Sequence, residues 1–80
     1  MKAKIIVMPR AEVLDPQGEA VRQGLASLGY DGVRHVRVGR YVELELESTE
    51  DTAASAIVQR MCEQLLANEV IEDFEFSVES

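Results

Sequence analysis

The chain has 80 residues, one cysteine and a formal net charge of −7, from 15 acidic residues against 8 lysines and arginines. A chain of this length forms one domain at most, here residues 1–80, and buries only about 60 to 65% of the surface that its unfolded form exposes. The acidic balance argues against a nucleic-acid or anionic-membrane surface as the partner, because both need a positive field.

Such a small core usually needs additional stabilisation. Cys62 is the only cysteine, so an internal disulfide is excluded, and no Cys/His cluster has the spacing of a metal site. We therefore expect an oligomer. The apolar run before Pro9 is too short for a signal peptide, and no stretch approaches the roughly 20 apolar residues of a membrane span. We expect a cytoplasmic protein.

The first predicted element is a strand from Lys2 to Met8. Its centre, Ile5-Ile6-Val7, is a continuous apolar run closed by Pro9. Such a run is typical of a strand that is buried on both faces or lies inside an assembly.

A helix is predicted from about Pro16 to Leu28. Asp15 is a suitable N-cap, Pro16 suits the first helical position, and Gly29 follows as the C-terminal cap. The glycine at position 18 hints at close approach of another backbone, and so does Gly24. The buried stripe of this helix is predicted to be Val21, Leu25 and Leu28.

Residues 33–47 can form either a hairpin that turns at Gly39-Arg40 or one long strand. A hairpin would place Val36 and Val38 on the face that carries the glutamates at positions 43, 45 and 47. In a continuous strand all even-numbered apolar residues share one face, and Gly39 allows a bend. We favour the long bent strand, which at some 40 to 50 Å would serve two sheets and bridge a dimer.

The second helix is predicted to begin at Ser48 or Thr49 and to end near Ala67, where Asn68 would take the left-handed conformation. A strand with Phe74 and Phe76 on one face follows. The predicted core stripe of the helix is broad: Ala54, Ile57, Val58, Met61, Cys62, Leu65 and Leu66.

The predicted order is therefore strand, helix, long bent strand, helix, strand, in an α+β fold. Two chains could exchange the halves of their long strands and so build two ferredoxin-like subdomains, each with helices on one face of an antiparallel sheet.

Candidate chemical groups are few. His35 is the only histidine and has no nucleophile near it in sequence, so a solvated strand residue is the simpler interpretation. Cys62 lies in an apolar stripe and is expected to be a buried structural thiol. We therefore predict no catalytic residue, no metal site and no cofactor in this chain, which favours a docking or scaffolding role.

Two charged groups on the long strand could meet a ligand. Arg34, His35, Arg37 and Arg40 could contact a phosphate or an acidic partner, because arginine offers a planar fork of donors. The glutamates at positions 43, 45 and 47 share one face and could form either a solvated face or a metal site, of which we favour the first.

Several segments, in order along the whole chain, resemble the PurS family, the small subunit of phosphoribosylformylglycinamidine (FGAM) synthase. They are Val13-Leu14-Asp15-Pro16-Gln17-Gly18, Leu28-Gly29-Tyr30, Val36-Arg37-Val38-Gly39-Arg40, Cys62-Glu63-Gln64-Leu65-Leu66-Ala67-Asn68 and Val70-Ile71-Glu72-Asp73. The chain departs from the family at Arg40, Glu69 and Phe74, where Lys, Pro and Tyr are frequent.

The resemblance implies a segment-sharing homodimer, with a tetramer left open, that joins a large synthetase subunit to a glutaminase subunit. The complex converts formylglycinamide ribonucleotide (FGAR), glutamine, ATP and water into FGAM, glutamate, ADP and phosphate. ATP and magnesium are expected in the large subunit. The implied role of the small subunit is assembly and help with ammonia transfer.

The sequence suggests which residues dock the partners, although capping alone would explain Asp15 and Asn68. The predicted docking residues are Asp15, Gln17, Arg37, Arg40, Asn68 and Glu72. Two other functions stay open: a ferredoxin-like regulatory module that binds a small ligand through the arginine cluster, and a small enzyme such as an acylphosphatase that uses Arg10.

Overall fold

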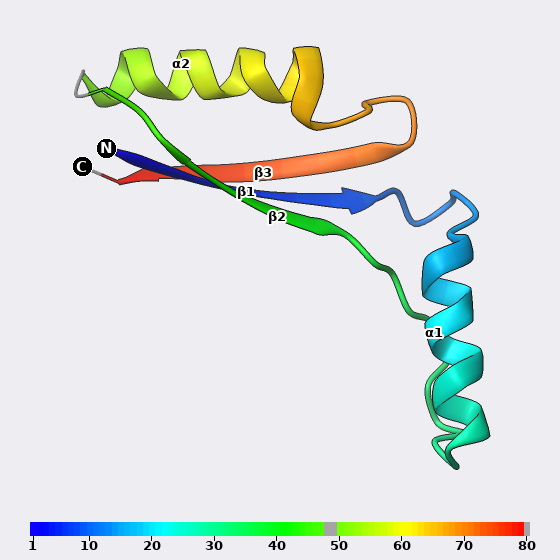
Figure 1. Ribbon diagram of the computed structural model, residues 1–80. Coiled ribbons are helices and arrows are strands. Elements are labelled where there is room, and N and C mark those ends of the chain that lie inside the picture. Colours follow the sequence, from blue (N-terminus) through cyan, green and yellow to red (C-terminus); the bar gives the residue numbers. More distant parts are fainter. Residues whose placement is uncertain (48–49, 80) are drawn as a thin grey trace.

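The computed structural model describes residues 1–47 and 50–79. It is built from an antiparallel sheet, two helices and one π-helical turn (Figure 1). In chain order the elements are β1 (Lys2–Pro9), α1 (Pro16–Ser27), β2 (Arg40–Glu45), α2 (Asp51–Met61), the π-helical turn η1 (Cys62–Leu66) and β3 (Glu72–Glu79).

The sheet has the order β2-β1-β3, with both pairings antiparallel. Ile5 in the central strand lies opposite Val42 of β2 and Phe76 of β3. Ile5 is fully buried, whereas Ile6 beside it is 42% exposed. The prediction of a strand buried on both faces is therefore wrong for the single chain, because helix covers only one face of the sheet (Figure 1).

Helix α2 covers that face with a narrow stripe. Ala54, Val58 and Cys62, each four residues apart, are fully buried, and α2 packs against β3. Within the single chain the buried stripe is narrower than predicted, because Ile57 is 43% exposed and Leu65 is 84% exposed. Helix α2 leaves the inner side of β2 only partly covered: Val42 and Leu44 of β2, and Leu46 just after it, are half-buried.

Helix α1 stands away from the sheet, and residues 33–39 run beside it (Figure 1). We call residues 16–39 the arm. The radius of gyration of the chain is 16.1 Å, whereas a compact domain of this length would have about 12 Å. The predicted stripe of α1 is not buried: Val21 is 44% exposed and Leu28 is 75% exposed.

The long strand is shorter than predicted. Arg40–Glu45 pairs with β1, and Leu46 continues this pairing through backbone hydrogen bonds with Met1, whereas residues 33–39 have no strand partner in the described part of this chain. The hairpin does not form either, because β2 pairs with β1. Gly39 sits at the bend, where a Cβ atom would collide with the side chain of Met8 and the carbonyl of Val7.

The helix ends were predicted in part. Asp15 caps α1, Pro16 begins it, and Gly29 takes the left-handed conformation with φ 101°. Helix α2 begins at Asp51, and the predicted starts at positions 48 and 49 lie outside the described residues. Asn68 does not take the left-handed conformation, because no described residue other than glycine has a positive φ. The chain leaves η1 through Ala67, which is extended.

Candidate functional site

Five of the six predicted docking residues, all except Gln17, lie at two joints that hold the arm and the turn after η1 in place. At the root of the arm, Asp15 accepts hydrogen bonds from the backbone N–H of Val38 at 2.9 Å and of Gly18 at 3.1 Å. These two donors, the Val38 N–H foremost, lower the pKa of Asp15. One carboxylate thus ties the start of α1 to the extended segment beside it.

Two neighbouring features complete this joint. Arg37 Nη1 donates to the carbonyl of Pro9 at 3.2 Å, which links the extended segment to the end of β1. A Cβ atom at Gly18 would collide with the carbonyl oxygen of Val36. The hint of close backbone approach is confirmed at Gly18 but not at Gly24, where a Cβ atom would meet nothing within 4 Å. Gln17 is exposed.

The second joint crosses the end of the sheet. Arg40 in β2 binds Glu72 in β3 through two hydrogen bonds of 2.8 and 3.0 Å, and its Nη2 also donates to the carbonyl of Leu66 at 2.7 Å. The Glu72 carboxylate accepts a further hydrogen bond from the N–H of Asn68 at 2.8 Å. The Arg40 guanidinium first, and then the Asn68 N–H, lower the pKa of Glu72.

The side chain of Asn68 stabilises the turn itself. Its Oδ1 accepts from the N–H of Val70 at 3.2 Å, and its carbonyl accepts from the N–H groups of Ile71 and Glu72. Asn68 and Glu72 are therefore occupied within the chain. Any partner contact at this joint must come from the surface that these residues position.

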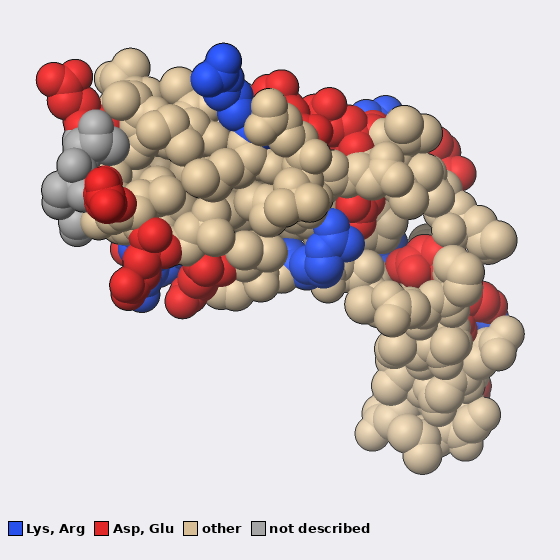
Figure 2. Space-filling model, turned by 45° about the horizontal axis from the view of Figure 1, so that its top comes forward, with Lys and Arg blue, Asp and Glu red and all other residues tan. Residues whose placement is uncertain are grey.

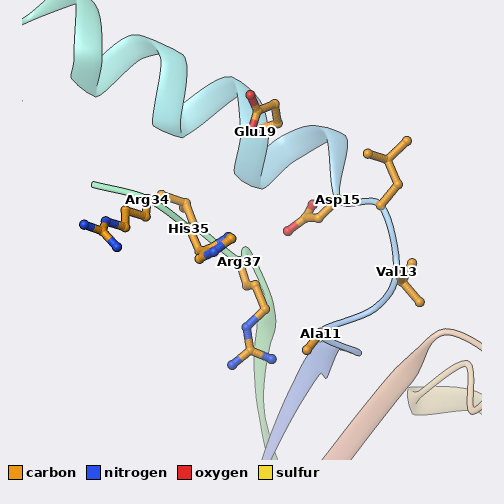
Figure 3. Close-up of a pocket in the computed structure, with 9 residues that line it drawn as sticks. Ala11, Val13, Asp15, Glu19, Arg34, His35 and Arg37 are labelled. Carbon is orange, nitrogen blue, oxygen red and sulfur yellow. The ribbon is translucent and has the colours of Figure 1, made fainter. Parts of the chain in front are cut away.

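The basic cluster predicted from the sequence is divided between the two joints. Arg34, His35 and Arg37 line a hollow of about 500 Å³ between α1 and the extended segment, together with Asp15 and Glu19 (Figure 3). Arg40 lies outside this hollow. The Arg34 and Arg37 side chains point in different directions in Figure 3, so their guanidinium groups do not converge on one point.

The acids of this hollow are satisfied within the chain. Glu19 accepts hydrogen bonds from Arg22, at 2.9 Å from its Nε, and from Gln23 at 3.4 Å. Arg22 lowers the pKa of Glu19 through this contact. The hollow therefore has carboxylates that are paired within the chain, and its basic residues Arg34, His35 and Arg37 are exposed to solvent.

Cys62 is the first residue of η1, directly after α2, and belongs to the hydrophobic core, where burial raises the pKa of its thiol. The predicted structural thiol is confirmed as a buried residue.

His35 is exposed. Within residues 1–47 and 50–79, no three side chains of His, Cys, Asp or Glu are placed to hold a metal ion together. No helix in these ranges is long and apolar enough to cross a membrane.

The Arg40–Glu72 pair should contribute measurably to stability. In a double-mutant cycle of Arg40→Gln and Glu72→Gln, we expect a coupling energy of about 1 kcal/mol at pH 7, kept modest because Arg40 is half exposed to solvent. The pKa of Glu72 is lowered on folding, so its contribution is present above its ordinary value of 4.5 and is lost as the pH falls through the lower folded pKa.

Urea unfolding at pH 7 and at pH 3 would measure both effects. Glu69→Gln, at an exposed neighbouring position, is the control. A coupling energy of zero at pH 7 would show that the pair does not stabilise the turn.

An apolar group on the uncovered face of the sheet was not predicted from the sequence. Ile6, Met8 and Tyr41 gather there, on the side opposite α2. The sequence does contain a signal for this group: Lys2, Lys4, Ile6 and Met8 are alternate residues and share one face of β1. The signal is weak because the continuous apolar run Ile5-Ile6-Val7 is also typical of a strand buried on both faces.

Comparisons with known proteins cover nearly all of this chain. The family profile described as PurS, phosphoribosylformylglycinamidine (FGAM) synthase, matches residues 2–80. The phosphoribosylformylglycinamidine synthase subunit PurS of Synechocystis sp. is 52% identical over 75 residues, which are 94% of this chain and 75% of that protein.

Solved structures agree with this match. The structure of B. subtilis PurS is 47% identical, with a TM-score of 0.88 and coverage of 99% of this chain and 98% of that one. A chain in the structure of PurLQS from Thermotoga maritima is 36% identical, with a TM-score of 0.83 and coverage of 95% and 93%. The chain therefore belongs to the PurS family of FGAM synthase subunits.

Proposed function

We propose that this chain is the small assembly subunit of an FGAM synthase complex in purine biosynthesis. It would bring the glutaminase and synthetase subunits together and help ammonia to pass between them. The match over residues 2–80 carries the proposal, and the likeness to a chain of the Thermotoga maritima PurLQS structure supports it. ATP and magnesium would act in the large subunit.

The subunit would work as a homodimer in which each chain inserts its arm into the other. The arm has an uncovered apolar stripe, and Figure 2 shows that its visible surface is mostly free of charged residues. The inner side of β2 is only half-buried, because α2 lies along β3. It is the apolar surface that could receive the stripe of a partner's arm. A partner's α1 placed beside α2 would cover both apolar surfaces.

The extended segment 33–39 would join the sheet of the partner. Strand β2 lies at an edge of the sheet, so its outer backbone groups are free to pair with another strand. Adding segment 33–39 would give each subdomain four strands with two helices on one face. That is a ferredoxin-like arrangement, and it would place residues 33–47 of each chain across both subdomains.

Charge also favours this pairing. If Val36 and Val38 face inward like Val42 of the partner, then His35 and Arg37 share the outer face with the partner's Glu43 and Glu45. Opposite charges on neighbouring strands attract, whereas the same glutamates paired with each other would repel. The basic and acidic halves of residues 33–47 are thus complementary between two antiparallel copies.

Reconstitution would test the function. FGAM formation from glutamine would be measured with the cognate synthetase and glutaminase subunits, with and without this chain, beside the same assay supplied with ammonium salt. We expect omission of the chain to abolish the glutamine-dependent reaction and to leave the ammonia-dependent reaction intact. Equal glutamine-dependent rates in both mixtures would contradict an assembly role.

A further inference from the structure

We propose that the uncovered face of the sheet is the surface on which a larger subunit docks, through a basic amphipathic segment. We call this surface the open face; it consists of the outward side chains of β1, β2 and β3. This proposal rests on the proposed function and specifies which surface of the chain performs it. The shape, polarity and charge of the open face support it.

The polarity of the open face changes along β1. Lys2 and Lys4 are what a solvated face should present, but the next outward residues are Ile6 and Met8. Ile6 is 42% exposed in the central strand, and Tyr41 opposite it is 56% exposed. Exposed apolar side chains gathered at one end of a sheet indicate a contact surface, because burying them on a partner is favourable.

Two hollows flank Ile6. The first, of about 350 Å³, has Tyr41 as its other apolar outward side chain, beside Lys4 and Ser77. The second, of about 140 Å³, has Met8, beside Asp73. Glu75 borders both hollows, whereas Phe74 and Phe76 lie opposite Val7 and Ile5 and pack against the core. Two shallow hollows with apolar and charged walls, separated by Ile6, suit a docking segment that is itself amphipathic.

The charges of the open face identify the occupant. Lys4 pairs with Glu79 at 3.2 Å, and Lys2 lies 3.9 Å from Glu43. Glu75 has no ion-pair partner among the described residues, and it lies in β3, away from the edge of β2 that would pair with the partner. A second copy of this acidic face would bring like charges together, whereas a lysine or arginine beside the apolar side chains of another subunit would neutralise Glu75.

The open face also stays free in the proposed dimer. The partner's α1 would lie on the same side of the sheet as α2, and segment 33–39 would pair with the edge of β2. Neither covers the outward side of β1. Each chain of the dimer would therefore offer this surface to the larger subunits.

The test uses the full-length dimer and the separately purified cognate synthetase and glutaminase subunits, with glutamine, ATP and magnesium present. Ile6→Thr removes the central apolar side chain and keeps a β-branched residue in the strand. Glu75→Lys reverses an exposed charge that borders both hollows and has no part in the proposed dimer contact. Glu63→Lys makes the same change of charge at an exposed position off the open face.

For both open-face variants we expect binding to one larger subunit to weaken about tenfold or more, with the dimer intact by light scattering and the control binding like the wild type. The charge variant should also lose part of the salt dependence of binding. Wild-type binding by both open-face variants would overturn the inference and leave the proposed function standing.

Two further outcomes would separate the inference from the proposed function. If the wild type is a tetramer and Ile6→Thr is a dimer, a second copy of the chain covers the open face and the inference is overturned. If the wild-type chain binds neither larger subunit, the proposed function itself fails.

Discussion

The Leu28→Asp chain is expected to be a folded monomer at concentrations where the wild type is a dimer. Leu28 is 75% exposed in the single chain, so its replacement should cost little stability there. In the proposed dimer both copies of Leu28 would be buried. Losing about 2 kcal/mol of burial at each of the two sites should raise the dissociation constant about 1,000-fold. Sedimentation velocity over a concentration series would measure this constant.

Ser27→Asp is the matched control for this prediction. It places the same charge at the same end of α1, but at an exposed position away from the apolar stripe. Its dissociation constant should stay close to that of the wild type. Equal dissociation constants for Leu28→Asp and Ser27→Asp would show that the stripe of α1 does not form the dimer contact.

Gly18→Ala should disrupt the arm, although alanine is normally the better residue within a helix. A Cβ atom at position 18 would collide with the carbonyl oxygen of Val36 and lie 2.6 Å from Asp15 Oδ2. The extended segment would have to move, which would weaken the bond from the Val38 N–H to Asp15. We expect a loss of about 2 kcal/mol in the free energy of unfolding, as for other overpacked sites.

Gly32→Ala is the control, because a Cβ atom there meets nothing within 4 Å. The free energy of unfolding of this variant should change by less than about 0.5 kcal/mol. Urea unfolding of both variants, with amide hydrogen exchange at Val38 as a local readout, would measure the effect. A Gly18→Ala chain as stable as the wild type would mean that the arm adapts to the methyl group without cost.

The ends of α1 could be predicted from the sequence because they depend on neighbouring residues alone. Asp15 accepts a hydrogen bond within its own turn, Pro16 has no N–H group that the first turn would leave without an acceptor, and Gly29 adopts a positive φ without a steric cost. The alternation of residues 40–45 was equally local, since side chains in any strand alternate between two faces.

The candidate site could be predicted only in part. Arg40, Asn68 and Glu72 were singled out as charged or polar residues at element ends, and the structure brings all three together. Their role as internal contacts could not be seen in the sequence, because Arg40 and Glu72 are 32 residues apart and meet only across the sheet. Sequence spacing predicts contacts along one helix or strand but not contacts between elements.

The sequence by itself determined the order of the elements, the caps of α1, the inward parity of the apolar residues and the family. Only the tertiary structure decided that α1 leaves the sheet, that residues 33–39 lie beside it, and that Ile6 and Tyr41 share an uncovered face. Local propensity and periodicity act within a few residues and show which side of an element is apolar. What covers that side depends on packing between distant segments, and for the arm the proposed cover belongs to a second chain.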